Sequence, residues 1–73
     1  MSKEMEFFIY LLERYVEYKN MTTKQVIQEW ESLHITDFIY NMYEVYHIEC
    51  IENAFEDIDR IISERREENL GTA

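Results

Sequence analysis

The sequence has few residues that break helices or cross-link a chain. Of its 73 residues none is proline, one is glycine at position 71, and one is cysteine at position 50. A single cysteine excludes an intrachain disulfide, and one glycine near the end excludes a glycine-rich phosphate-binding loop. Structural zinc of the usual kind needs several Cys and His ligands, and only Cys50, His34 and His47 are present. We therefore expect no metal and no cofactor.

Basic residues are scarce, and their scarcity narrows the choice of partner. The formal net charge is −9, and no Lys or Arg occurs between Lys24 and Arg60. Phosphate backbones are bound by Lys and Arg, so nucleic acid is a poor candidate. A helix-turn-helix over the second and third predicted helices would read DNA with Asp37 and Glu44 and no basic side chain. A protein with a basic surface suits this charge better.

Long apolar runs are absent as well. The longest, residues 7–12, is too short for a signal-peptide core or for the roughly 20 residues that cross a bilayer. We expect no membrane contact and a cytoplasmic location, with which one unpaired cysteine agrees. With 47% hydrophobic residues the chain is nevertheless apolar enough to fold.

Without proline or internal glycine, apolar periodicity and capping residues must define the elements. They predict an all-α fold, a compact bundle of four helices over about residues 3–18, 23–33, 37–46 and 49–66. Ser2 can cap the first helix, and Thr22 with Gln25 has the spacing of a capping box for the second. No glycine or proline forces a break between the third and fourth helices, but the apolar stripe shifts at residues 47–49, so we predict one. Residues 1–66 form the domain and 67–73 a flexible tail.

Two features of the apolar stripes lead to further predictions. Trp30 lies on the same stripe as Val26 and Leu33, which predicts that it is a core residue. The first helix has an apolar face too wide for one neighbour, and a chain this short has little interior to cover it. We therefore predict a homodimer through that face, which includes Phe7, Phe8, Leu11 and Leu12.

Motifs that carry chemistry are weak. Glu44-x-x-His47 has the spacing of one ligand motif of a di-iron bundle, but such a bundle needs two copies and two further glutamates, and the sequence has one copy. Cys50 lies three residues after His47, yet a nucleophile also needs a third group that orients its base. We expect His47 to satisfy a helix end, Cys50 to pack as a small apolar residue, and the protein not to be an enzyme.

An acidic ridge on the last helix is the strongest candidate for a binding surface. Its residues, Glu49, Glu52, Glu56 and Asp59, fall on one side of a helix, away from the apolar stripe. The ridge can dock on a basic partner and speed encounter. The alternative is an ordinary solvated face, with Arg60 paired to Glu56. Tyr10, on the polar face of the first helix, is the second candidate contact.

Several short segments of the chain, taken together, carry a resemblance. They are Ser2-Lys3-Glu4, Leu11-Leu12-Glu13, Tyr15, Tyr18-Lys19, Trp30, Asp37, Ile39-Tyr40, Tyr43, Tyr46-His47, Glu52-Asn53-Ala54-Phe55 and Asp57-Ile58-Asp59. Over residues 2 to about 62 the chain resembles a family of short bacterial all-helical domains of unknown function. Members are often encoded beside an ADP-ribosyltransferase-like toxin, and the resemblance implies an antitoxin-like or accessory role without supplying catalytic residues.

The leading hypothesis is a non-enzymatic protein-interaction domain that accompanies or neutralises a basic partner encoded nearby. Two alternatives stay open at this point. One is a structural homo-oligomer paired through the first helix, and the other is a metal-binding helical protein.

Overall fold

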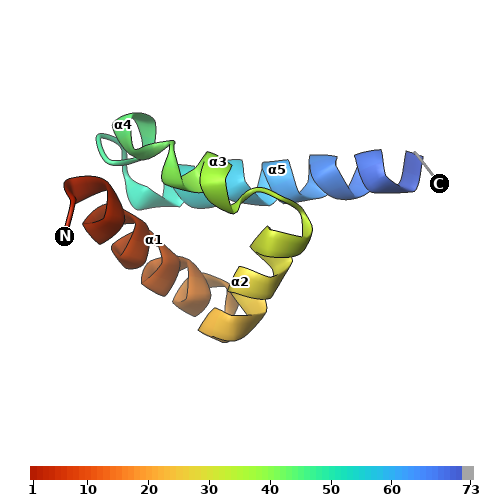
Figure 1. Ribbon diagram of the computed structural model, residues 1–73, viewed down its shortest axis with the longest axis horizontal. Coiled ribbons are helices and arrows are strands. Elements are labelled where there is room, and N and C mark those ends of the chain that lie inside the picture. Colours follow the sequence, from red (N-terminus) through yellow and green to blue (C-terminus); the bar gives the residue numbers. More distant parts are fainter. Residues whose placement is uncertain (72–73) are drawn as a thin grey trace.

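The computed structural model describes residues 1–71, and the all-α prediction is confirmed in them. They contain α1 (Lys3–Lys19), α2 (Thr23–Ser32), α3 (Thr36–Tyr40), α4 (Tyr43–Tyr46) and α5 (Ile51–Gly71), and no strand. Figure 1 shows α1 and α2 as a V, with α5 running across its open side and α3 and α4 beside the first half of α5. Among these residues no helix has the length and apolarity needed to cross a membrane.

The first two helices begin where their capping residues predict. The Ser2 hydroxyl accepts a hydrogen bond from the backbone N–H of Met5 at 3.1 Å. At α2 the Thr22 side chain accepts from the N–H of Gln25 at 3.1 Å, and the Gln25 side chain accepts from the N–H of Thr22 at 2.9 Å. These bonds satisfy N–H groups that have no partner inside the helix, so both starts are fixed locally.

Both helices end in a left-handed residue that is not glycine. Asn20 follows α1 with φ 54°, and His34 follows α2 with φ 58°. After α2 the N–H of Ile35 reaches back to the carbonyl of Trp30 at 3.0 Å, and the same kind of bond closes α1. This is a Schellman ending, for which glycine is the usual residue because it has no Cβ. With no glycine available, the sequence uses Asn and His, which tolerate positive φ better than most residues.

The prediction of a single third helix over residues 37–46 is wrong, because two short helices, α3 and α4, occupy this region. The backbone reaches ψ values near zero at Asn41 and Met42, and the N–H of Met42 bonds to the carbonyl of Ile39, three residues back. That tighter bond ends α3 and redirects the chain into the one turn of α4. Neither short helix has a side-chain cap. The predicted break before the last helix is confirmed, since α4 ends at Tyr46 and α5 begins at Ile51.

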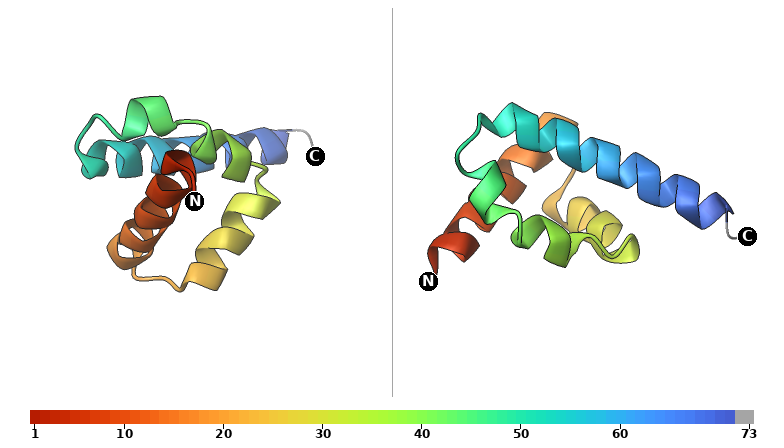
Figure 2. Two further views of the ribbon diagram at one scale, coloured as in Figure 1. Left: turned by 60° about the vertical axis from the view of Figure 1, so that its left-hand side comes forward. Right: turned by 90° about the horizontal axis from the view of Figure 1, so that it is seen from above.

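The last helix is shifted relative to the prediction of 49–66. It begins at Ile51, which leaves Glu49 in the connection, and it continues to Gly71. The apolar stripe does end near Arg66, but Glu67, Glu68 and Leu70 are good helix formers and nothing interrupts the ladder. Of the tail predicted for residues 67–73, residues 67–71 are therefore helical, and residues 72 and 73 lie outside the described part. The last turns project beyond the other helices (Figure 2).

The core lies where α1, α2, α3 and α5 meet, and Trp30 is fully buried in it, as predicted. Its ring packs against Tyr15 at 5.5 Å and Phe8 at 6.0 Å between centroids. The wide apolar face of α1 is largely covered by the chain itself: Leu11 is fully buried, and Phe7, Phe8 and Leu12 are partly buried against the core. The chain thus has more interior than its length led us to expect.

Candidate functional site

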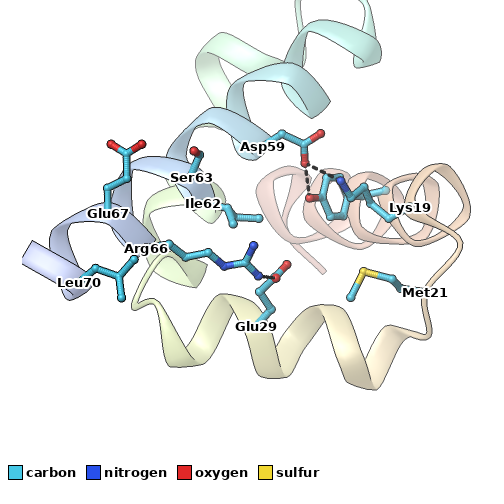
Figure 3. Close-up of a pocket in the computed structure, with 10 residues that line it drawn as sticks. Lys19, Met21, Glu29, Asp59, Ile62, Ser63, Arg66, Glu67 and Leu70 are labelled. Atoms are coloured by element: carbon cyan, nitrogen blue, oxygen red, sulfur yellow. Dashed lines mark hydrogen bonds and ion pairs between the residues drawn. The ribbon is translucent and has the colours of Figure 1, made fainter.

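A cleft of about 390 Å³ lies between the second half of α5 and the V of α1 and α2 (Figure 3). Its walls combine apolar side chains with charged side chains of both signs. The apolar side chains are Met21, Ile62 and Leu70, and the polar ones are Tyr15, Lys19, Glu29, Asp59, Ser63, Arg66 and Glu67.

A buried tyrosine reaches one end of this cleft. The Tyr15 hydroxyl donates a hydrogen bond to Asp59 Oδ1 at 2.6 Å, and Lys19 Nζ lies 3.4 Å from the same oxygen. Burial, reinforced by the hydrogen bond to Asp59 and by its negative charge, raises the pKa of Tyr15 far above its ordinary value. Tyr15 therefore stays neutral and acts as a donor that ties α1 to α5.

An ion pair bridges the middle of the cleft. Arg66 on α5 contacts the carboxylate of Glu29 on α2. Four of the charged groups around the cleft, Lys19, Glu29, Asp59 and Arg66, are thus engaged with each other. The contacts around the cleft therefore hold α5 against α1 and α2.

A second tyrosine makes the same kind of bond on the other flank of α5. The buried Tyr46 hydroxyl donates to Asp57 Oδ2 at 2.5 Å, and Arg60 pairs with that carboxylate and with Glu64. Burial raises the pKa of Asp57, but the hydrogen bonds from Tyr46 and Arg60 and the charge of Arg60 outweigh it, so the pKa lies below its ordinary value. The predicted pairing of Arg60 with Glu56 is not found; Arg60 faces Asp57 and Glu64 instead.

Two of the four residues of the predicted acidic ridge, Asp59 and Glu49, lie differently from the prediction. Asp59 is half-buried and is engaged by Tyr15 and Lys19. Glu49 lies in the connection before α5, whereas Glu52 and Glu56 are exposed on the helix. Hydrogen bonds from its own backbone N–H and from Cys50 hold the pKa of Glu52 below its ordinary value, so this charge persists at mild acidity.

Exposed acidic and exposed aliphatic residues follow one another along the chain around the α4–α5 connection. We call Glu44, Glu49, Glu52 and Glu56, together with Val45 and Ile48, the α4–α5 surface. Ile48 is 75% exposed and Val45 is 44% exposed. Sequence reasoning missed these two residues, although both lie off the apolar stripes and so had no predicted place in the core.

The remaining sequence candidates are not brought together into a reactive site. His47 Nδ1 donates to the Tyr43 carbonyl at 2.5 Å, which agrees with the expected role at a helix end. Cys50 is exposed and is not packed as predicted. Within residues 1–71 no three His, Cys, Asp or Glu side chains gather where they could hold a metal ion.

Tyr10, the other candidate contact, is 48% exposed on α1, as its place on the polar face predicts. Its ring lies 6.3 Å from that of Phe7 and carries the Arg14 guanidinium at 5.5 Å from its centroid. Phe7 in turn contacts the rings of Tyr43 on α4 and of His47, the residue that follows α4. The structure therefore brings Tyr10 to the side of the molecule where α4 lies.

Comparison with known proteins identifies a family without an assigned activity. No curated protein and no solved structure matches the chain. The family model described as "Protein of unknown function (DUF3791)" matches residues 6–65, which spans α1 to the middle of α5. The resemblance inferred from the sequence is thus confirmed at the level of a family of unknown function, and this chain belongs to the DUF3791 family.

Proposed function

We propose that this protein is a non-enzymatic interaction domain that binds a basic protein through its α4–α5 surface. The observation that carries the proposal is that Ile48 and Val45 are exposed in a stretch with several acids and no Lys or Arg. Exposed aliphatic groups supply contact area, and the surrounding carboxylates select a positively charged partner.

The charges of the molecule support this surface over the cleft. Around the cleft Lys19 and Arg66 are paired with Asp59 and Glu29, so the net field there is small. The α4–α5 surface has four glutamates, and within residues 1–71 none of them forms a salt bridge. A concentration of one sign of charge steers an oppositely charged partner and raises the rate of encounter.

The sequence resemblance suggests what the partner is. Because such domains are often encoded beside an ADP-ribosyltransferase-like toxin, we propose that toxin, or another basic protein encoded nearby, as the partner, with an antitoxin-like or accessory role for this chain. Nothing in the proposal requires catalysis by this domain.

The proposal is tested by association kinetics with the neighbouring toxin. The variant Glu49→Gln, Glu52→Gln, Glu56→Gln removes three charges from the α4–α5 surface, and Glu13→Gln, Glu31→Gln, Glu68→Gln removes three exposed charges elsewhere. We expect the first to slow association roughly tenfold at low salt and to reduce its salt dependence, and the control to change it little. Asp59 is left intact because it holds Tyr15.

Two results would contradict the proposal. Equal slowing by both triple variants would mean that only net charge matters. Unchanged association in the first variant would place the contact elsewhere.

Self-association through α1 is the second candidate, and it stays a prediction. Leu11, Phe7, Phe8 and Leu12 pack on the chain's own core, so the free part of α1 is narrower than expected. Met5 and Ile9 remain more than one-third exposed on the same helix. Light scattering at micromolar concentration should then show a dimer, and a clean monomer at high concentration would remove this candidate.

A further inference from the structure

Four aromatic side chains form a continuous row beside the α4–α5 surface. We call Phe7 and Tyr10 of α1, Tyr43 of α4 and His47, which follows α4, the aromatic row. Phe7 meets Tyr43 edge-on at 5.8 Å and His47 edge-on at 6.4 Å, and Tyr10 lies 6.3 Å from Phe7. The row crosses from one helix to the other, so it exists only when α4 is packed on α1.

The single turn of α4 builds the outer part of this row. Tyr43 and His47 are four residues apart, and their rings stack with 4.1 Å between centroids and 3° between planes. The bond from His47 Nδ1 to the Tyr43 carbonyl holds the imidazole in this position. Tyr10 and His47 are exposed and belong to no part of the buried core. Arg14 lies over one face of the Tyr10 ring and Tyr43 stacks on one face of the His47 ring. The remaining exposed part of each ring is therefore what the row offers to solvent.

Within the molecule an arginine side chain already packs on one of these rings. The Arg14 guanidinium lies over the Tyr10 ring at 5.5 Å while it pairs with Glu17 at 3.2 Å. A planar guanidinium stacks on aromatic faces, whereas a lysine ammonium acts mainly as a hydrated point charge. The glutamates of the α4–α5 surface attract both cations, and a carboxylate can also pair with a guanidinium through two hydrogen bonds. Only removal of a ring can therefore assign a preference for arginine to the aromatic row.

We infer that the aromatic row seats arginine side chains of the partner, so that the domain prefers an arginine-bearing protein segment over a lysine-bearing one. This inference rests on the proposed function and names the chemistry of its partner. The glutamates bring the positive segment to this side of the molecule, and the exposed rings of Tyr10 and His47 select the guanidinium.

Two synthetic peptides test the inference on the full chain, one of alternating arginine and serine and one of alternating lysine and serine with the same length. We expect the arginine peptide to bind about threefold tighter, the size of an exposed cation–π contact. It should also shift the NMR signals of the Tyr10 and His47 rings in the unmodified protein.

Tyr10→Leu should abolish the preference for the arginine peptide. Tyr18→Leu is the matched control, because Tyr18 is also an exposed tyrosine with a cation, Lys19, over its ring but lies outside the row. It should keep the preference.

Equal affinity for the two peptides, no binding of either, unshifted ring signals, or a preference that survives Tyr10→Leu would each overturn the inference. Equal affinity with slowed toxin association in the α4–α5 triple variant would leave the proposed function standing. A failure of the arginine preference is thus distinguished from a failure of the proposed function.

Discussion

The two parts of this molecule are built differently. α1 and α2 begin at side-chain caps and end in Schellman bonds, and together with α5 they enclose most of the fully buried side chains. The segment from α3 to the start of α5 has two short helices without side-chain caps and exposes Phe38, Val45 and Ile48. The first part therefore supplies most of the stability. The second part is shaped by its contacts with the first and carries the exposed α4–α5 surface.

The two parts should differ most in how much the free energy of unfolding falls when one apolar side chain is removed from each. Trp30→Ala should lower the free energy of unfolding by about 3–5 kcal/mol, because it empties the centre of the core. Ile48→Ala should change it by less than about 0.5 kcal/mol, because Ile48 is exposed. Urea denaturation measures both.

Trp30→Phe serves as a control for Trp30. The indole Nε1 has no hydrogen-bond partner, so phenylalanine loses volume but no hydrogen bond, and its cost should be clearly smaller than that of alanine. A Trp30→Ala protein that melts close to the parent would refute the division into a stabilising part and a surface part.

The two tyrosine–aspartate hydrogen bonds allow the same comparison, since Tyr15 belongs to the first part and Tyr46 to the second. Tyr15→Phe and Tyr46→Phe should each lower the free energy of unfolding by about 1.5–3 kcal/mol, the typical contribution of a hydrogen bond to a charged group. Loss of Tyr46 should also loosen α4, seen as faster amide exchange there, whereas loss of Tyr15 should not. Identical exchange patterns in the two variants would mean that the parts unfold as one.

Alkaline pH should weaken both bonds. The pKa of each tyrosine is raised by burial first and then by its aspartate, so the hydroxyl keeps its proton in the folded chain after the unfolded chain has lost it. This contribution is complete below the unfolded pKa of about 10 and declines above it by about 1.4 kcal/mol per pH unit for each tyrosine. Melting temperatures measured above pH 10 should fall, and the double variant Tyr15→Phe, Tyr46→Phe should fall less steeply.

At acidic pH the dependence of stability on pH has the opposite sign, and Asp57 is the partly buried carboxylate that contributes to it. The pKa of Asp57 is lowered in the folded chain, so its contribution is present above the unfolded pKa of about 3.9 and is lost as the pH falls toward the folded value. Tyr46→Phe should reduce this acid dependence and Tyr15→Phe should not, which chemical denaturation below pH 4 would reveal.

The smallest expected effect concerns the junction between the two parts. His34 has φ 58°, a conformation that costs a residue with a Cβ about 1 kcal/mol relative to glycine. His34→Gly should therefore raise the free energy of unfolding by up to that amount, whereas Glu31→Gly, inside α2, should lower it by a similar amount. A destabilised His34→Gly protein would show that the imidazole itself stabilises the junction.

The sequence by itself determined the helical class, the starts of α1 and α2, the break before α5 and the burial of Trp30. Each depends on a short-range signal: a cap and its partner lie three residues apart, and an apolar stripe repeats within one helix. The break at Asn41 and Met42 carried no such signal, because neither residue forbids a continuous helix. The end of α5 was misplaced because the apolar stripe ends before the helix does.

The tertiary structure alone decided which charged residues are available to a partner. On a helical wheel Asp59 belongs with Glu52 and Glu56, but Tyr15, 44 residues away, binds it from another helix. The exposure of Ile48 and the row from Tyr10 to His47 likewise depend on how α4 packs on α1. Spacing along one helix fixes a side chain's direction, whereas its partner across the core is set by packing of distant segments, which a periodic pattern does not encode.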